Sequence, residues 1–167
     1  MSARHTLSTL ALALAIAACA KPAEQTAAMP MVDSAAVKAA VAEVWSRWVT
    51  ADTSGNVDAV VALVTDSARL DLRGMPPIMG RASFRTMAET ALKSMDITSL
   101  VITPEMTEAI SNELAYETGN YTEAYTLDRK PMVDYGRYAA AVAKDADGQW
   151  RVQYLMAFAD STVTVKK

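Results

Sequence analysis

The spacing of apolar side chains changes along this chain, and the change limits the folds open to it. Before about residue 95, apolar residues mostly recur every three or four positions, as on one face of a helix. From Asp96 onward they mostly alternate with polar residues, as in half-buried strands. Helices followed by a run of strands favour an α+β domain over a parallel sheet with alternating helices.

The local signals predict three helices and five strands. We expect helices over 34–52 and 82–95, with a short helix between them that begins after the capping residue Asn56. Asp33 or Ser34 caps the first helix. We expect strands over 68–72, 97–109, 114–127, 132–144 and 149–159, with residues 162–167 either extending the last strand or fraying. Pro104 suggests that its strand lies at an edge or carries a bulge.

The N-terminus has the layout of a secretory signal. A basic start is followed by a short apolar run and by Ile16-Ala17-Ala18-Cys19, which resembles the lipobox of bacterial lipoproteins. The apolar run falls short of the roughly 20 residues that span a bilayer. We therefore expect a signal peptide over 1–18, a lipidated tether over 19–32, a folded domain over 33–160 and a tail over 161–167. With Ala20 after the lipidated Cys19, we expect an anchor in the outer membrane that faces the periplasm.

Cleavage of this signal excludes several kinds of chemistry. It removes His5, the chain's one histidine, and lipidation uses Cys19, its one cysteine. A Ser-His-Asp triad, a cysteine nucleophile and a His-ligated zinc are thereby excluded, and we expect no metal or cofactor. Loss of Arg4 leaves 15 basic and 19 acidic side chains, scattered without a basic cluster. We therefore expect no nucleic-acid partner.

Several short motifs together resemble a known superfamily. They are Gly55-Asn56-Val57-Asp58-Ala59-Val60-Val61-Ala62-Leu63, Ile78-Met79-Gly80-Arg81, Leu114-Ala115-Tyr116-Glu117-Thr118-Gly119-Asn120-Tyr121, Asp134-Tyr135-Gly136-Arg137-Tyr138 and Asp147-Gly148-Gln149-Trp150-Arg151-Val152. In this order the motifs resemble the nuclear-transport-factor-2-like superfamily, and above all SnoaL-like and ketosteroid-isomerase-like bacterial domains, over about 33–160. The resemblance implies a cone: a bent antiparallel sheet wraps around about three N-terminal helices, with an apolar pocket at its mouth. It also implies that the outer face of the sheet pairs two copies.

The groups that ketosteroid isomerases use are missing at the matching positions. Their aspartate base falls on Leu72, and the neighbouring Asp71 points to the opposite face of its strand. Their oxyanion aspartate falls near Ala140, and the first helix has tryptophans but no tyrosine. The isomerase constellation is therefore absent unless the register slips by one residue.

The remaining candidates line the expected cone. We expect the pocket to be lined by Trp48, Leu72, Met79, Tyr121, Tyr138 and Tyr154, with Asp71, Asp134 and Arg137 as possible polar groups. Glu117 and Glu123 are further carboxylates on these strands. A carboxylate inside an apolar cone would have a raised pKa and could serve as a base.

Two functions from different classes remain open. One is a lipid-anchored, non-catalytic domain whose cone binds a small apolar ligand or a partner protein. The other is a cofactor-independent isomerase, cyclase or dehydratase that uses carboxylates and tyrosines as acids and bases. The missing base and histidine favour the first, whereas a carboxylate inside the cone near a tyrosine hydroxyl would favour the second. The segment 138–143 is apolar on both faces, so we also expect a homodimer through the sheet.

Overall fold

The structure is a computed structural model that describes residues 31–165. The expected signal peptide, Cys19 and nearly all of the expected tether lie outside the described residues. Within residues 31–165, no helix is both long enough and apolar enough to cross a membrane.

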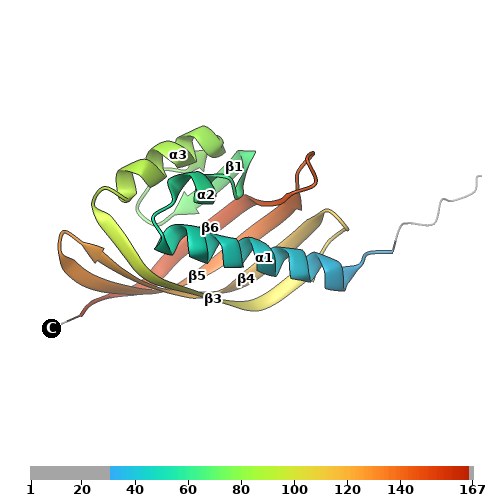
Figure 1. Ribbon diagram of the computed structural model, residues 1–167. Helices are drawn as coiled ribbons and strands as arrows, with labels where there is room; N and C mark the ends of the chain where they lie inside the picture. Colours follow the sequence, from blue (N-terminus) through green and yellow to red (C-terminus); the bar gives the residue numbers. More distant parts are fainter. Residues whose placement is uncertain (1–30, 166–167) are drawn as a thin grey trace, which may run out of the picture. The chain divides into compact units, whose positions relative to one another are not determined.

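Helices come first and long strands last, as the change of spacing predicts (Figure 1). The helices are α1 (Ser34–Thr53), α2 (Val57–Val61) and α3 (Gly80–Ala91). The strands are β1 (Val64–Leu72), β2 (Ile78–Met79), β3 (Met95–Ala109), β4 (Leu114–Leu127), β5 (Lys130–Lys144) and β6 (Trp150–Thr164). The α+β class is confirmed.

Side-chain caps begin the first two helices where the sequence places them. The Asp33 carboxylate accepts a hydrogen bond from the Ala36 amide at 3.0 Å, and the Asn56 side chain accepts one from the Ala59 amide at 3.0 Å. Each cap satisfies an amide that has no partner inside its helix. The two caps fix where the long α1 and the short α2 begin.

The first strand begins earlier than expected. The alternation of apolar and polar residues predicts a start at Ala68, but α2 ends at Val61 and β1 begins at Val64. Val64 is fully buried and pairs with Val152 of β6, and the register then shifts before Arg69. Burial against β6 therefore overrides the local helical spacing of this segment.

The third helix is shorter at its C-terminus than its apolar spacing predicts. It ends at Ala91, residues 92–94 turn, and Met95 already belongs to β3. The two-residue β2 precedes it and was not expected. The last strand continues to Thr164, where it pairs with Met132 of β5, so this segment extends the strand.

The sheet is curled and mixed, with the order β2-β1-β6-β5-β4-β3. All its neighbouring pairs are antiparallel except β1 and β6, which run parallel. Figure 1 shows α1 lying across one face of the curled sheet, with α2 and α3 beside β1. This is the expected cone, with the parallel pair as an addition.

Local features of the long strands account for the curl. Pro104 lies on the edge strand β3, and the register shifts between it and Met106. An edge position and a bulge are what a proline in a strand predicts. Opposite Pro104 on β4 is Gly119, where a Cβ atom would meet the Thr103 carbonyl oxygen and, at 2.8 Å, the Tyr138 ring. The strands can approach this closely because that position carries no side chain.

The core lies between α1 and the concave face of the sheet. The predicted stripe of α1 is buried, from Val37 and Val41 to Trp45 and Trp48. It packs with buried residues of β1, β5 and β6 in one cluster. Toward the C-terminal end of α1 this packing opens into a cavity.

Candidate functional site

A cavity of about 580 Å³ lies between α1, α3 and the concave face of the sheet. Its apolar lining includes Trp45, Trp48, Leu70, Leu72, Phe84, Met87, Leu100, Ile102 and Leu155. The ring centroids of Trp45 and Trp48, and of Trp48 and Phe84, are 5.8 Å apart, so aromatic rings form a continuous wall. This size and this lining are typical of small-molecule sites.

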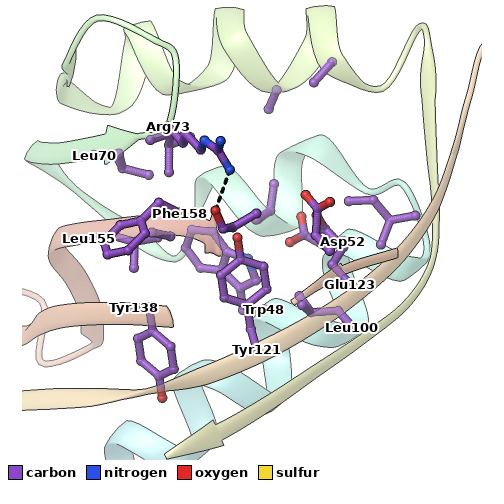
Figure 2. Close-up of a pocket in the computed structure, with 18 of the residues that line it drawn as sticks. Trp48, Asp52, Leu70, Arg73, Leu100, Tyr121, Glu123, Tyr138, Leu155 and Phe158 are labelled. Carbon is purple, nitrogen blue, oxygen red and sulfur yellow. Dashed lines mark hydrogen bonds between the residues drawn. The ribbon is translucent and has the colours of Figure 1, made fainter. Parts of the chain in front are cut away.

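Three carboxylates reach the cavity from three different elements. Asp52 comes from the last turn of α1, Glu123 from β4 and Asp134 from β5. Glu123 and Asp134 are direct cross-strand partners. Figure 2 shows the carboxylates of Asp52 and Glu123 next to each other. The cavity therefore has an acidic region within an otherwise apolar lining.

Burial and crowding raise the pKa of two of these groups. The pKa of Glu123 rises to about 7, mainly because burial disfavours its charge and further because Asp52 and Asp134 are negative. The pKa of Asp52 rises to about 6 through burial, which its interaction with the Trp48 side chain partly offsets. Both carboxyl groups therefore exchange protons near neutral pH, the range in which acid–base catalysts work.

Tyrosine hydroxyls accompany the carboxylates. Tyr125 donates a hydrogen bond to Asp134 at 3.3 Å. Tyr121 also lines the cavity, and burial raises its pKa to about 12. Asp134 is therefore a carboxylate inside the cone next to a tyrosine hydroxyl, the arrangement that favours an enzyme over a binding domain.

Tyr138 contributes its ring to the cavity and directs its hydroxyl elsewhere. Its ring lies edge-on to Trp45, with centroids 5.5 Å apart. Its hydroxyl donates to Glu117 at 2.7 Å, and Thr107 donates to the same carboxylate at 2.6 Å. Glu117 is 2% exposed, so this network belongs to the core.

Four of the six expected lining residues lie at the cavity: Trp48, Leu72, Tyr121 and Tyr138. Met79 does not, because it lies on the two-residue β2 and is 57% exposed. Tyr154 also does not, because its strand phase turns it to the outer face, where it donates to Asp71 at 2.9 Å. These two placements correct the expectation.

Of the three expected polar groups, only Asp134 reaches this cavity. Asp71 lies on the outer face with Tyr154 and Arg69. Arg137 forms a two-point ion pair with Asp160, at 2.9 and 2.8 Å, and stacks on Phe158. Because neighbours on a strand alternate faces, Asp71 and Arg137 point away from the cavity that Leu72 and Tyr138 line.

Asp52 was missed in the sequence, although a signal for it exists. It follows Trp48 by four positions and therefore continues the buried stripe of α1. A carboxylate on a buried stripe needs an explanation, since such groups are seldom buried without a partner. The spacing alone could have placed it in the cone.

The site offers little to bind a metal or an anion. Within residues 31–165, no group of three or more His, Cys, Asp or Glu side chains is arranged to hold a metal ion. The cavity lining contains one cation, Arg73, whose Nη1 donates to the Ala159 carbonyl oxygen at 2.6 Å (Figure 2). The charge of the lining is therefore predominantly negative.

These features define a class: α+β domains in which a curled sheet and N-terminal helices enclose an apolar pocket. The chain belongs to the SnoaL-like domain family, whose model matches residues 33–156. This confirms the resemblance seen in the sequence. Among proteins with curated descriptions, none is similar enough in sequence to match.

Solved structures share the fold at low sequence identity. A ketosteroid isomerase-like protein from Erwinia carotovora atroseptica has a TM-score of 0.67 and 16% identity, over 74% of this chain and 95% of that one. A putative scytalone dehydratase from Novosphingobium aromaticivorans has a TM-score of 0.68 and 13% identity, over 80% and 90%. The hexachlorocyclohexane dehydrochlorinase LinA-type3 from Novosphingobium barchaimii has a TM-score of 0.68 and 14% identity, over 78% and 91%.

Proposed function

We propose that this domain is a cofactor-independent acid–base enzyme of the isomerase, cyclase or dehydratase kind. The observation that carries the proposal is the pair formed by Asp52 and Glu123, whose pKa values rise to about 6 and 7 in an apolar cavity. Such shifts are common at catalytic sites and rare at ordinary surface carboxylates. Three carboxylates in one cavity also argue against simple apolar ligand binding, which has no use for them.

The pair supplies a base and an acid in the same pH range. As interacting groups, the two carboxyls titrate together, with one proton between them over the interval from about 6 to 7. Asp52 ionises first and is the base, whereas Glu123 keeps its proton and is the acid. No metal or cofactor is needed for this division of roles.

The chemistry balances with these two groups. Asp52 takes a proton from a carbon next to a carbonyl group, and the C–H electron pair forms the double bond of an enolate. In an isomerisation, the proton then returns to a different carbon. In a dehydration, the enolate electron pair forms a carbon–carbon double bond while the C–O bond on the neighbouring carbon breaks, and Glu123 gives its proton to the departing hydroxyl group, which leaves as water. The names of the dehydratase and dehydrochlorinase neighbours, both elimination enzymes, support this class of reaction.

The test follows α-proton exchange in a small apolar ketone. The full-length protein is incubated with 2-tetralone in deuterium oxide near pH 6.5, and deuterium incorporation is followed by proton NMR. We expect exchange faster than in buffer and a loss of about 100-fold or more in Asp52→Asn, as for general bases. Asp96→Asn is the matched control, because Asp96 is exposed between the lining residues Met95 and Ile97 without lining the cavity itself.

The alternative function predicts a different outcome. If 2-tetralone quenches the fluorescence of the cavity tryptophans but its exchange equals that in buffer, the domain binds ligands without catalysis. Equal exchange by wild type and Asp52→Asn would also contradict the proposal.

We further propose that a lipid on Cys19 anchors the domain to the bacterial outer membrane, on the periplasmic side. The support is the residue pattern around Ile16-Ala17-Ala18-Cys19. Because a single acyl chain holds a protein only weakly, stable anchoring needs two or more chains.

A further inference from the structure

The hydroxyl of Tyr121 differs from those of the three tyrosines on these strands that hydrogen-bond within the fold. The hydroxyls of Tyr125, Tyr138 and Tyr154 each donate a hydrogen bond to a carboxylate. The Tyr121 hydroxyl donates to no protein group among residues 31–165, and Figure 2 shows it directed into the cavity. It is a donor that the fold itself leaves unused.

Gly136 keeps the Tyr121 ring in this position. The two residues are cross-strand partners on β4 and β5. A Cβ atom at Gly136 would lie 2.5 Å from both Cε1 and Cζ of Tyr121 and 2.6 Å from the Phe158 carbonyl oxygen. The ring therefore lies across the backbone of β5, which fixes the direction of the hydroxyl.

The hydroxyl stays protonated at neutral pH. Burial and the charges of Glu123, Asp134 and Asp160 raise the pKa of Tyr121 to about 12. A protonated phenol can donate to a ligand acceptor. The nearby carboxylates cannot serve as donors once ionised.

Trp45 lines the same cavity with its ring, but its indole Nε1 is buried without a hydrogen-bond partner among the described residues and is not exposed to the cavity. The unpaired donor that a ligand can reach is therefore the Tyr121 hydroxyl. It indicates a ligand that brings its own oxygen acceptor.

The charges of the lining restrict the ligand further. Asp52, Glu123 and Asp134 oppose the entry of an anion. Arg73 is exposed, and it already donates to the Ala159 carbonyl oxygen. The lining therefore offers no free, buried counter-charge to an anionic group.

We propose that the substrate of this cavity is an uncharged, apolar molecule with an oxygen acceptor, and that Tyr121 donates a hydrogen bond to that oxygen. The inference rests on the proposed function only in taking this cavity as the substrate site. It makes Tyr121 a specificity-determining residue and Gly136 a positioning residue.

The test compares two molecules that differ by one acceptor. Dissociation constants of 2-tetralone and tetralin are measured with the full-length protein by quenching of tryptophan fluorescence at pH 6.5. We expect the ketone to bind about three- to tenfold more tightly, which is the range of one neutral hydrogen bond. Tyr121→Phe should remove this preference while leaving tetralin binding unchanged. The control is Tyr135→Phe, because Tyr135 is 49% exposed on the same sheet. This variant should keep the preference for the ketone.

The charge restriction has its own probe. Tetralin-2-carboxylate should bind at least tenfold more weakly than 2-tetralone at pH 8. Equal binding of the carboxylate, or an unchanged ketone preference in Tyr121→Phe, would overturn the inference.

The two proposals fail in different ways. Deuterium exchange without a Tyr121-dependent ketone preference leaves the acid–base function standing and removes the role of Tyr121. A Tyr121-dependent preference without exchange supports the ligand class and removes the acid–base function.

Discussion

Glu123 and Asp134 are direct partners across β4 and β5, and both carboxylates face the same cavity. Like charges at directly opposed positions of a sheet destabilise it. The Asp52 carboxylate lies beside Glu123 from α1, which increases the crowding there (Figure 2). The fold therefore holds together charges that separate in the unfolded chain, and this relationship leads to the first two predictions.

Glu123→Gln should stabilise the protein at pH 8 and leave its stability nearly unchanged at pH 4.5. The folded-state pKa of Glu123 is about 7, above its ordinary value of 4.5. The folded state therefore binds more protons between these values, and stability falls as pH rises through them. We expect a gain on the order of 2 kcal/mol in the free energy of unfolding at pH 8, since one pKa unit corresponds to about 1.4 kcal/mol. Urea unfolding at both pH values measures it.

Glu108→Gln is the control for this stability measurement. Glu108 is exposed on β3, so its replacement should change the free energy of unfolding by less than about 0.5 kcal/mol at either pH. A Glu123→Gln protein that is less stable than wild type at pH 8 would show that its carboxylate is stabilised rather than crowded.

The rate of deuterium exchange into 2-tetralone should follow a bell-shaped pH profile with its maximum near pH 6.5. Asp52 must be ionised to take the proton, and an ionised Glu123 beside it would oppose the negative charge of the enolate, so the pKa values of about 6 and 7 bound the active range. In Glu123→Gln the upper limb should disappear, because the group that loses its proton there is gone. A bell that Glu123→Gln leaves unaltered would assign the upper limb to another group.

Glu117→Ala should lower the free energy of unfolding of the domain by about 2 to 4 kcal/mol. Glu117 belongs to the core and is not one of the proposed acid–base groups. Its carboxylate accepts hydrogen bonds from Tyr138 and Thr107, and removal leaves a cavity and unpaired hydroxyls in the core. The double variant Glu117→Leu/Tyr138→Phe should recover part of the loss, because both partners are then apolar. Thermal or urea unfolding of the three proteins tests the order of stability.

Cys19→Ser should move the protein from the membrane fraction to the soluble fraction of bacterial cells. The reason is loss of the lipid that Ile16-Ala17-Ala18-Cys19 predicts. Fractionation and immunoblotting compare it with Ser8→Ala, a change upstream in the same leader. A wild type that is already soluble and begins at another residue contradicts the anchor.

The outer face of the sheet should pair two copies of the chain. On that face Ala141 lies between Tyr116 and Tyr154, and Ala139 is paired with Met156. Small residues there allow close approach, and Met156 is 39% exposed. Light scattering at micromolar concentration should give a dimer in wild type and a monomer in Met156→Glu. Exposed Met31, far along the chain from this face, provides the control change Met31→Glu.

The local elements could be predicted because neighbouring residues determine them. The caps at Asp33 and Asn56 and the buried stripe of α1 depend on spacing within one helix. The hairpin turn at Asp128 and Arg129, both with positive φ, is likewise local. The order of helices and strands, and through it the fold class, follows from these signals.

The site depended on contacts between residues far apart in the sequence. The parallel pairing of β1 with β6 moved the start of β1 to Val64, and strand phase placed Asp71 and Tyr154 on the outer face. A shift of one residue in register reverses the face of every side chain on a strand, so spacing alone could not decide which strand carboxylates enter the cone. Asp52, Glu123 and Asp134 come from a helix and two strands, and only the tertiary packing of these elements brings them into one low-dielectric cavity and raises the pKa values of Asp52 and Glu123.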